Sequence, residues 1–297
     1  MLRTKLLTLS AVTAAAALSL TACAPSSSQG GGGDAAGSSS AGESTSSGSG
    51  ERLRIGIKFD QPGLGYREGS AQPTGFDTDV ARYVADKLGV AEKDIEWVQT
   101  PSANRENALE NGEVDMIFAT YSITDARKER VAFAGPYFVA GQDLLVRADD
   151  TAITGPESLE GKNLCSVTGS TSAQKIKDQF ASGVNLVEQG GYAECVTYLE
   201  SGQVDAVTTD DIILAGLAAA DANKGKFKVV GNTFTTERYG VGLPKDSERC
   251  EDINEAIKEM KDSGEWKKAL ESNTEGTGYT YDETLNSGED AEFEPCA

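Results

Sequence analysis

The chain has 297 residues, and none of them is histidine. Serine and cysteine nucleophiles are commonly activated by a histidine, and most zinc sites contain one as a ligand. This absence excludes the usual Ser-His-Asp and Cys-His catalytic systems and argues against a zinc site. We therefore predict no metal site, no cofactor and no catalytic residue.

Long apolar runs are scarce as well. The one that stands out follows Met1-Leu2-Arg3-Thr4-Lys5 and ends at Leu20. It is too short for a permanent membrane span, so we interpret residues 1–22 as a signal peptide. The next residues, Leu20-Thr21-Ala22-Cys23, resemble a lipobox, which predicts a lipid (palmitate) on Cys23 and an anchor on the outer face of the cell membrane. The alternative is an ordinary secretory signal with an incidental cysteine.

Residues 24–50 contain almost no apolar side chains, and 18 of these 27 residues are Gly or Ser. Such a segment behaves as a flexible coil, because it has too little apolar surface to bury. We interpret residues 23–50 as the lipidated cysteine and a linker to the folded part.

Positive charge is in short supply, since 27 Lys and Arg stand against 47 Asp and Glu and give a net charge of −20. Removal of the signal peptide takes away Arg3 and Lys5 and no acid, leaving −22. This charge repels nucleic acid, so we exclude that class of partner. It also opposes an acidic ligand at long range, although salt screens charges beyond about 8 Å. A site for an acidic ligand therefore needs its own cations.

Cysteine is rare, with five residues in all. If Cys23 is lipidated, the remaining four allow three pairings. In an oxidising exterior we favour Cys165–Cys195 and a Cys250–Cys296 bond that holds the C-terminal tail. Each loop closure should stabilise the fold by about 3–4 kcal/mol. Free thiols are the alternative.

A seven-residue segment occurs twice. Residues 109–115, LENGEVD, recur ninety residues later as LESGQVD at 199–205. Each copy has the pattern of a helix end, a Gly cap and a strand. Polar residues follow each strand, which predicts two similar lobes whose strand ends face each other across a cleft.

The hydrophobic pattern alternates between strands and helices, which is typical of an α/β fold. For lobe 1 we predict residues 51–143 plus 238–297, and for lobe 2 residues 144–237. The expected strands are 53–57, 95–98, 114–118, 163–167, 184–188, 205–208 and 228–230. The expected helices are 76–88, 104–110, 171–180, 212–222 and 251–271. Crossings at 142–147 and 238–243 should form a hinge.

Hydroxyl residues and an arginine follow the first repeat strand. Thr120 and Ser122 come directly after it, and Arg127 lies one short segment further on. Arginine presents a planar fork that binds a carboxylate in a bidentate manner, so this pattern predicts a carboxylate clamp. The alternative is a surface helix in which Arg127, Lys128 and Arg130 are solvated.

Several motifs in this region resemble those of a known family. SITDAR at 122–127 and FAGPY at 133–137 are similar to the signature of family-3 extracellular solute-binding proteins, the receptors of ABC-type importers for polar amino acids. The resemblance covers about residues 51–270. It implies a two-lobed periplasmic-binding-protein type II fold, and a monomeric receptor that delivers its ligand to a membrane permease and its ATPase subunits. Further matching blocks are GFDTD at 75–79, LEGK at 159–162, GST at 169–171 and YGVGL at 239–243.

By this resemblance, one set of residues holds the α-amino acid group. Arg127, Thr120 and Ser122 would bind the carboxylate from lobe 1. Ser170 and Thr171 would add donors from a helix N-terminus in lobe 2, where free N–H groups attract anions; simple N-capping is their alternative role. Asp210, at the end of the second repeat strand, would bind the ammonium group.

A second set would choose the side chain. Lys58, Ser102 and Arg105 match positions of glutamate/aspartate-binding proteins, and two extra cations argue for a second carboxylate on the ligand. The alternative pairs Lys58 and Arg105 with Asp60 or Glu106 on the surface. Phe76 matches a residue that stacks on the ligand, or else is a buried first-turn residue. Tyr192 matches another contact of that subgroup, and Gln61 stands where many members carry an aromatic cluster.

The predicted function is therefore a lipid-anchored extracellular receptor for glutamate, with aspartate as a second ligand. A receptor for glutamine or another polar amino acid is the alternative. An enzyme on the same fold, such as a dehydratase acting on a cyclohexadienyl amino acid, would need a general acid, for which Glu68, Asp60 or Asp210 are the candidates. A ligand-sensing subunit that docks on a signalling receptor would share the whole pocket.

Overall fold

The computed structural model describes residues 52–179 and 183–296. The predicted signal peptide, the lipidation site Cys23 and the linker lie outside these residues. Within the described part, no helix combines the length and the apolar character needed to cross a membrane.

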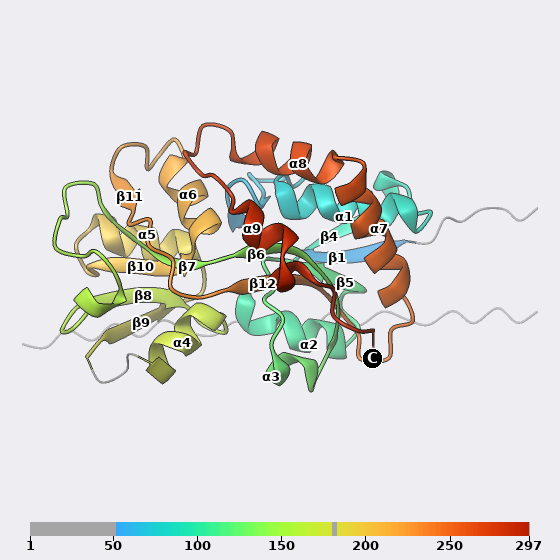
Figure 1. The fold of residues 1–297 in the computed structure, drawn as a ribbon, viewed down its shortest axis with the longest axis horizontal. Helices are drawn as coiled ribbons and strands as arrows, with labels where there is room; N and C mark the ends of the chain where they lie inside the picture. The colour runs from blue at the N-terminus through green and yellow to red at the C-terminus, as the bar shows by residue number, and fades with distance from the viewer. Residues whose placement is uncertain (1–51, 180–182, 297) are drawn as a thin grey trace, which may run out of the picture. The chain divides into compact units, whose positions relative to one another are not determined.

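Two five-stranded sheets form the centres of two lobes (Figure 1). Lobe 1 is the first sheet with its helices, and lobe 2 the second sheet with its own. The first sheet has the order β4-β1-β5-β12-β6, and the second has the order β11-β7-β10-β8-β9. The strands of the first sheet are β4 (Ile95–Gln99), β1 (Leu53–Ile57), β5 (Met116–Phe118), β12 (Glu237–Leu243) and β6 (Ala132–Ala140). Those of the second are β11 (Phe227–Val229), β7 (Gln142–Arg147), β10 (Ala206–Asp210), β8 (Asn163–Val167) and β9 (Asn185–Gln189).

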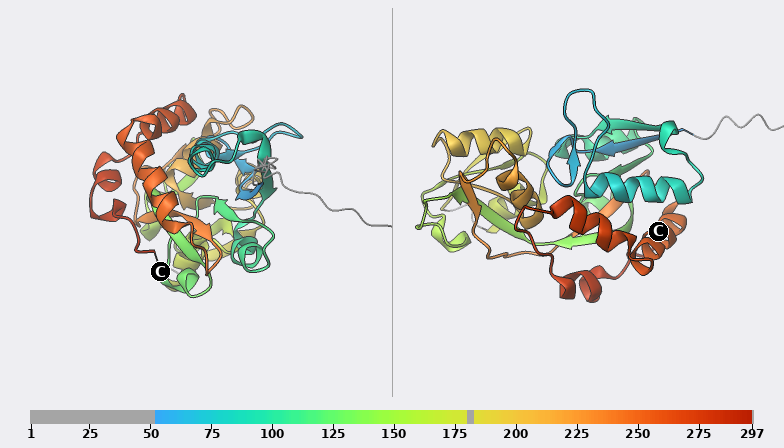
Figure 2. Two further views of the ribbon diagram at one scale, coloured as in Figure 1. Left: turned by 90° about the vertical axis from the view of Figure 1, so that its right-hand side faces the viewer. Right: turned by 90° about the horizontal axis from the view of Figure 1, so that it is seen from above.

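Parallel pairing of β1 with β4 and β5, and of β8 with β9 and β10, requires helical crossovers. Helices pack on these sheets, and the central strands β5, β10 and β12 are buried along almost their whole length. In lobe 1 these helices are α1 (Phe76–Lys87), α2 (Arg105–Glu110), α3 (Asp125–Lys128), α7 (Cys250–Asp262), α8 (Glu265–Thr274) and α9 (Glu283–Ser287). In lobe 2 they are α4 (Thr171–Gln179), α5 (Tyr192–Glu200) and α6 (Asp211–Ala219). The further views in Figure 2 show the C-terminal helices, orange to red, running beside the first sheet.

The chain crosses between the two sheets twice. β6 ends at Ala140 in the first sheet, and β7 begins at Gln142 in the second. The return is made by β12, which pairs with β5 and β6. This arrangement confirms the predicted two-lobed type II fold with two crossings, while the limits of 143 and 238 for the lobes remain proposed values.

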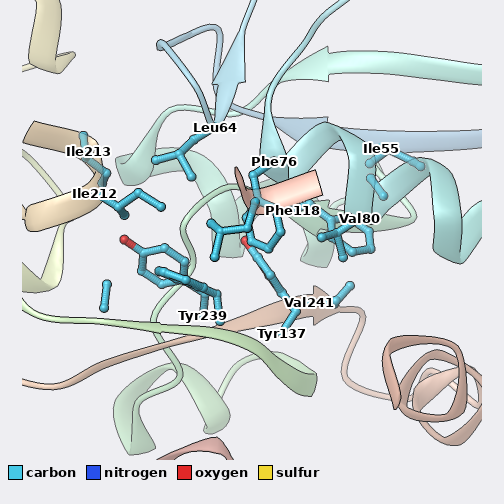
Figure 3. Packing of buried hydrophobic residues seen from close by; sticks show 14 of the residues in the cluster. Ile55, Leu64, Phe76, Val80, Phe118, Tyr137, Ile212, Ile213, Tyr239 and Val241 are labelled. Carbon is cyan, nitrogen blue, oxygen red and sulfur yellow. The ribbon is translucent and has the colours of Figure 1, made fainter. Parts of the chain in front are cut away.

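Aromatic side chains fill the core of lobe 1. The ring of Phe76, at the first turn of α1, packs edge-on against Phe138 at 5.6 Å and Trp266 at 5.8 Å. Figure 3 shows Phe76 beside Phe118 and Tyr137 in this cluster. The core of lobe 1 thus takes up the ring of Phe76, and its stacking on a ligand stays a prediction. The buried alternative describes its position.

Most predicted elements match the structure, and the main differences are the following. The single helix predicted at 251–271 is wrong, because Gly264, with φ of 80°, separates α7 from α8. The segment 142–147 is a full strand, β7, and β6 was not predicted as a strand. Helix α6 ends at Ala219, three residues before the predicted end, because Ala220 has an extended ψ of 139°.

The two repeated segments have the same local structure. Gly112 and Gly202 both adopt left-handed φ values, 64° and 73°, just after α2 and α5. The following aspartates then anchor the neighbouring strand: Asp115 accepts from Arg54 N at 2.7 Å, and Asp205 accepts from Asn163 N at 2.8 Å. The Gly cap and the strand start are therefore equivalent in the two lobes.

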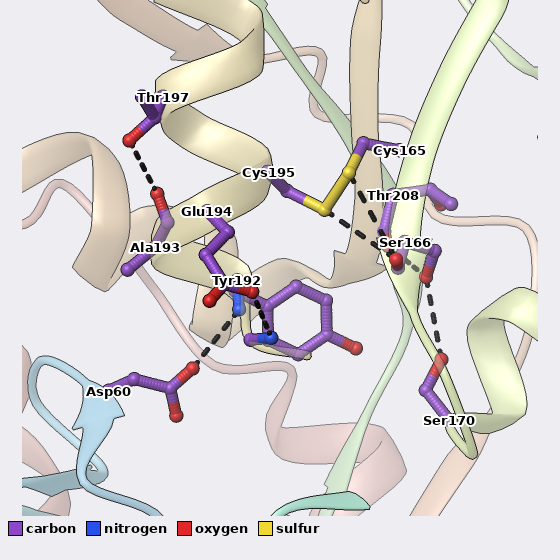
Figure 4. The surroundings of a disulfide bond; sticks show 11 residues. Asp60, Cys165, Ser166, Ser170, Tyr192, Ala193, Glu194, Cys195, Thr197 and Thr208 are labelled. Carbon is purple, nitrogen blue, oxygen red and sulfur yellow. Dashed lines mark hydrogen bonds between the residues drawn. A yellow bond between two sulfur atoms is a disulfide. The ribbon is translucent and has the colours of Figure 1, made fainter. Parts of the chain in front are cut away.

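Two disulfides join the cysteines in the pairs that we favoured. Cys165–Cys195 connects β8 to α5 in lobe 2 (Figure 4). Cys250–Cys296 connects the start of α7 to the C-terminal tail. The tail also hydrogen-bonds to β6, because the Asn286 side chain contacts both the N–H and the C=O of Val139.

Candidate ligand-binding site

Residues from the strand ends of the two lobes are in direct contact. Arg127 Nη2 of lobe 1 donates to the Gly169 carbonyl of lobe 2 at 2.9 Å. The hydroxyls of Ser122 and Thr171 lie 3.3 Å apart across the same boundary. The strand ends therefore meet, as the repeat predicted.

Cavities lie on this boundary. One of about 330 Å³ is lined by Arg127, Thr171 and Lys175 among others, and one of about 340 Å³ by residues including Lys58 and Asp60. A larger cavity of about 960 Å³ lies between α7 and the C-terminal tail, and none of the predicted ligand-binding residues lines it. We place the candidate site at the interlobe boundary, because the convergent polar groups are there.

Arg127 is held at the centre of the boundary. Helix α3 begins after Thr124, whose hydroxyl caps the Arg127 N–H at 3.3 Å. The guanidinium donates to the Ser122 carbonyl at 2.6 Å and forms an ion pair with Glu106 at 3.2 Å. Because Arg127 is only 9% exposed, the solvated-helix alternative is wrong for this residue.

The neighbouring cations behave differently. Lys128 forms ion pairs with Asp125 and Glu294, and Arg130 pairs with Glu110 at 2.5 Å. Both lie on the surface, where such pairs contribute little to stability.

The end of β5 has a strained backbone. Thr120 has φ of 45°, a value that non-glycine residues rarely adopt. Its N–H donates to the Asp77 carboxylate at 3.0 Å, and its hydroxyl contacts the Gln61 side-chain oxygen at 3.3 Å. Tyr137 donates to the other oxygen of Asp77 at 2.8 Å. Burial raises the pKa of Asp77 to about 6, so this fully buried carboxyl depends on these donors.

Lys58 is a buried cation that forms no ion pair within the part of the chain that the structure describes. It is 2% exposed, and its ammonium donates to the Ser102 hydroxyl at 2.8 Å. Burial lowers the pKa of Lys58 to about 8, and the charge of Asp60 opposes this shift. Among the residues that the structure describes, no ion pair connects Lys58 to Asp60 or to another carboxylate.

Arg105 is also a buried cation that forms no ion pair within the described residues. Its guanidinium is buried and donates to backbone carbonyls, those of Ala119 at 2.9 Å and Thr120 at 3.3 Å. Its Nε is buried and has no hydrogen-bond partner among residues 52–179 and 183–296. Burial and, secondarily, the charge of Arg127 lower the pKa of Arg105 to about 10. Glu106 pairs with Arg127 rather than with Arg105, so the surface-pairing alternative for the two cations is wrong.

Lobe 2 contributes acids and hydroxyls. The Asp210 carboxylate accepts from the Tyr239 hydroxyl at 2.5 Å through one oxygen, while the other is buried and unpaired within the described part of the chain. Burial, assisted by the charge of Glu237, raises the pKa of Asp210 to about 8. Ser170 caps α4 through the Ala173 N–H at 3.0 Å, as its N-capping alternative predicted.

Gln61 and Tyr192 also lie at the boundary. The Gln61 side chain is 1% exposed, and its amide nitrogen is buried with no hydrogen-bond partner in the described part of the chain. The Tyr192 N–H donates across the lobes to Asp60 at 3.0 Å, as Figure 4 shows. Burial raises the pKa of Tyr192 to about 12, so its hydroxyl is a neutral donor and acceptor.

Our sequence reasoning did not identify two residues of the site, Tyr121 and Glu237. The Tyr121 ring lies against both Arg105 and Arg127. Glu237 is 2% exposed at the start of β12, where it accepts from the Thr171 hydroxyl at 3.0 Å and pairs with Lys175. Alternation along the strand end marks Tyr121 only as a core residue, and an acid before a crossing strand carries no signal of its own.

Within residues 52–179 and 183–296, no group of three His, Cys, Asp or Glu side chains is arranged to hold a metal ion. The described groups at the boundary are cations, hydroxyls and carboxylates, and two carboxylate oxygens, one of Asp210 and one of Glu188, are buried without a hydrogen bond within the described residues. This set can bind a zwitterion that carries an additional anionic group.

Comparison with known proteins identifies the family. The sequence pattern of the bacterial extracellular solute-binding proteins, family 3, matches residues 53–274. The chain belongs to this family. Family 3 membership agrees with the type II fold and with the motifs at 122–127 and 133–137.

Named relatives of this family 3 protein bind amino acids. The chain is 48% identical over 232 residues to the glutamate-binding protein GluB of Corynebacterium efficiens, covering 74% of this chain and 78% of the relative. It is 38% identical to the glutamine-binding protein GlnH of Bacillus subtilis, over 73% of this chain and 78% of the relative. Among solved structures, an ancestral arginine-binding protein bound to glutamine matches with a TM-score of 0.69 and 36% identity, over 74% of this chain and 96% of that one.

Proposed function

We propose that this family 3 protein is a receptor for glutamate, with aspartate as a second ligand. Anchored by a lipid on Cys23 at the outer face of the cell membrane, it binds the amino acid between the lobes. It then delivers the amino acid to a membrane permease with its ATPase subunits. The similarity to GluB supports the glutamate assignment, and the similarity to GlnH makes glutamine the alternative ligand.

One observation carries the choice of glutamate. Lys58 and Arg105 are two buried cations, and neither forms an ion pair with a carboxylate among the described residues; the charges of Asp60 and Glu106 act on them at longer range. A buried charge without a partner is costly, and the cost falls when an anion enters the site. The α-carboxylate of an amino acid occupies the Arg127 clamp, so a second carboxylate is the group that suits Lys58 and Arg105.

The remaining groups suit the α-amino acid end. Ser122 and the first turn of α4, at Ser170 and Thr171, can add donors to the carboxylate that Arg127 holds. The unpaired oxygen of Asp210 is an acceptor for the ammonium group. Because each lobe holds part of the ligand, the closed arrangement is favoured when the ligand is present.

Titration calorimetry tests the ligand. The purified protein is stripped of bound amino acid by unfolding and refolding with its disulfides intact. It is then titrated with glutamate, aspartate, glutamine, asparagine and arginine. Strong binding of glutamate, alone or with aspartate, is expected. A preference for glutamine would overturn the role of Lys58 and Arg105, and a lack of binding across the panel would overturn the amino-acid assignment.

Arg105→Gln tests the side-chain site within the same experiment. The affinity for glutamate should fall by about 10- to 100-fold, because one charge-assisted contact contributes about 1.5–3 kcal/mol. The affinity for glutamine should change far less. Arg130→Gln is the matched control, since this arginine is exposed and pairs with Glu110 away from the boundary. Equal losses for glutamate and glutamine would contradict the assignment of Arg105.

The anchor and the importer need separate measurements. Cys23→Ser should move the protein from the membrane fraction to the medium. Deletion of the chain should abolish uptake of labelled glutamate at low concentration, and re-expression should restore it. Unchanged fractionation, or unchanged uptake, would contradict the corresponding part of the proposal.

A further inference from the structure

The ring of Tyr121 lies against two arginines of the site. The guanidinium carbon of Arg105 is 4.2 Å from the ring centroid, and that of Arg127 is 4.8 Å from it. Both distances are within the range of cation–π attraction, which is strongest where water is excluded. Tyr121 is fully buried, so both contacts are made in such an environment.

The ring occupies a fixed position. Phe133 packs against it edge-on with the ring centroids 4.8 Å apart. On another side lies Gly242 of β12, where an added Cβ would come within 2.6 Å of the Tyr121 ring. The backbone of the sheet therefore supports the ring directly, and the ring has little freedom to move.

The Tyr121 ring can offset the repulsion between the two neighbouring arginines. Arg105 and Arg127 carry the same charge, and the charge of Arg127 helps to lower the pKa of Arg105. Glu106 forms an ion pair with Arg127, whereas Arg105 has only backbone carbonyls as hydrogen-bond partners in the described structure. The negative face of an aromatic ring can stabilise both cations without adding an acid that would repel a carboxylate ligand.

We infer that Tyr121 is a specificity-determining positioning residue. Its ring fixes the spacing between Arg127, which binds the α-carboxylate, and Arg105, which binds the side-chain carboxylate. This inference rests on the proposed function. It assigns the recognition of a ligand with two carboxylates to three side chains instead of two.

The ring, and not the hydroxyl, performs this role. The Tyr121 hydroxyl is buried beside the carboxylate of Glu106, whereas both arginine contacts are made by the ring. Burial raises its pKa, and the charge of Glu106 adds to the shift, so the hydroxyl stays protonated. Tyr121→Phe should therefore keep both cation contacts.

Three variants and two ligands test the inference. Tyr121→Leu removes the ring, Tyr121→Phe keeps it, and Phe133→Leu is the control that disturbs the same apolar cluster without a contact to either arginine. If each buried cation–π contact contributes about 10- to 30-fold, Tyr121→Leu should weaken glutamate by about 100-fold or more and glutamine by about 10-fold. Tyr121→Phe should stay within about 3-fold of the wild type for both ligands.

The selectivity ratio is the readout that a purely structural role would not change. Phe133→Leu should lower the melting temperature and leave the glutamate-to-glutamine ratio unchanged, because the sheet backbone at Gly242 still supports the Tyr121 ring. A wild-type ratio in Tyr121→Leu, or an equal loss of the ratio in Phe133→Leu, would overturn the inference. Tyr121→Met, which fills more of the space, replaces the leucine variant if that variant does not fold.

Failure of the proposed function would be visible separately. If the wild type prefers glutamine, the glutamate assignment fails. In that case the role of Tyr121 is tested by the affinity for glutamine, because Arg127 would still bind the α-carboxylate of glutamine. Loss of glutamine affinity in Tyr121→Leu but not in Phe133→Leu would support the ring as a platform for Arg127, and equal losses would reject it.

Discussion

The repeated strands of the two lobes begin in the same way and end differently. Gly112 and Gly202 end the preceding helices with left-handed φ values, and Asp115 and Asp205 anchor the adjacent strands. Beyond β5, lobe 1 presents Arg127 close to Arg105. Beyond β10, lobe 2 presents acids and hydroxyls.

This difference shows that the residues that start each strand are distinct from the residues that form the site at its end. The Gly and Asp of the repeat set where each strand starts, and they can be retained while the residues after the strand change. At the boundary, lobe 1 supplies the buried cations Lys58, Arg105 and Arg127 and lobe 2 supplies the buried acid Asp210, although both lobes carry a net negative charge. Under the proposed function, an amino acid would be bound with its carboxylates toward lobe 1 and its ammonium toward lobe 2.

The largest effect on ligand affinity should come from removing Arg127, the proposed carboxylate clamp of lobe 1. Arg127→Ala should lower the affinity for every amino acid by at least about 100-fold, because two charge-assisted hydrogen bonds of about 1.5–3 kcal/mol each are lost. Calorimetric titration with glutamate and glutamine measures this. Arg130→Ala is the matched surface control and should bind as the wild type does. Retention of either ligand by Arg127→Ala would break the assignment of the carboxylates to lobe 1.

A pH series should give an effect of intermediate size on ligand affinity. It should distinguish the contribution of Asp210 in lobe 2 from that of Lys58 in lobe 1. Asp210 has a pKa of about 8 in the unliganded site, and an ammonium ligand lowers it, so binding below pH 8 releases a proton. Affinity therefore rises with pH up to about 8, by at most about tenfold per unit. Lys58 also has a pKa of about 8, and a carboxylate ligand raises it, so binding above pH 8 takes up a proton and affinity falls.

Glutamate should therefore bind best near pH 8, when titrated between pH 6 and pH 9. Glutamine has no second carboxylate, so its affinity should show the rise and only a weak decline. Asp210→Asn should remove the rise for both ligands. Identical profiles for glutamate and glutamine would show that Lys58 does not face the ligand.

The smallest effect should come from substituting the glycines that the two repeats share. An added Cβ meets no atom within 4 Å at Gly112 or at Gly202, so an alanine there suffers only from the left-handed backbone. Gly112→Ala and Gly202→Ala should each lower the free energy of unfolding by about 1 kcal/mol. Denaturant titration measures both, and ligand affinity serves as the control that should not change. A cost at one position only would show that the two copies are not equivalent.

Elements governed by local rules were predictable from the sequence. The cap at Gly112 and strand β1 follow from turn chemistry and alternation, and the cleft follows from the repeat. The helix at 251–271 was predicted as one, because amphipathic periodicity continues through Gly264 and does not show the left-handed turn there. Strand β6 contains the Gly135-Pro136 pair, which resembles a loop in sequence.

The site was predictable where a motif fixes a residue type, and less so where packing decides. Arg127 and Arg105 lie together in the structure, while Phe76 belongs to the aromatic core because three rings of lobe 1 meet there. Tyr121 could not be recognised, since its role depends on two arginines that are separated from it in sequence.

Two requirements oppose each other at position 120: a relaxed backbone and a hydroxyl at the lobe boundary. Its left-handed backbone costs about 1–2 kcal/mol relative to a relaxed residue, and glycine would remove that cost. Glycine would also remove the hydroxyl that reaches Gln61 at the boundary. A library screened for heat resistance should therefore enrich glycine at this position, whereas one screened for ligand capture should retain threonine.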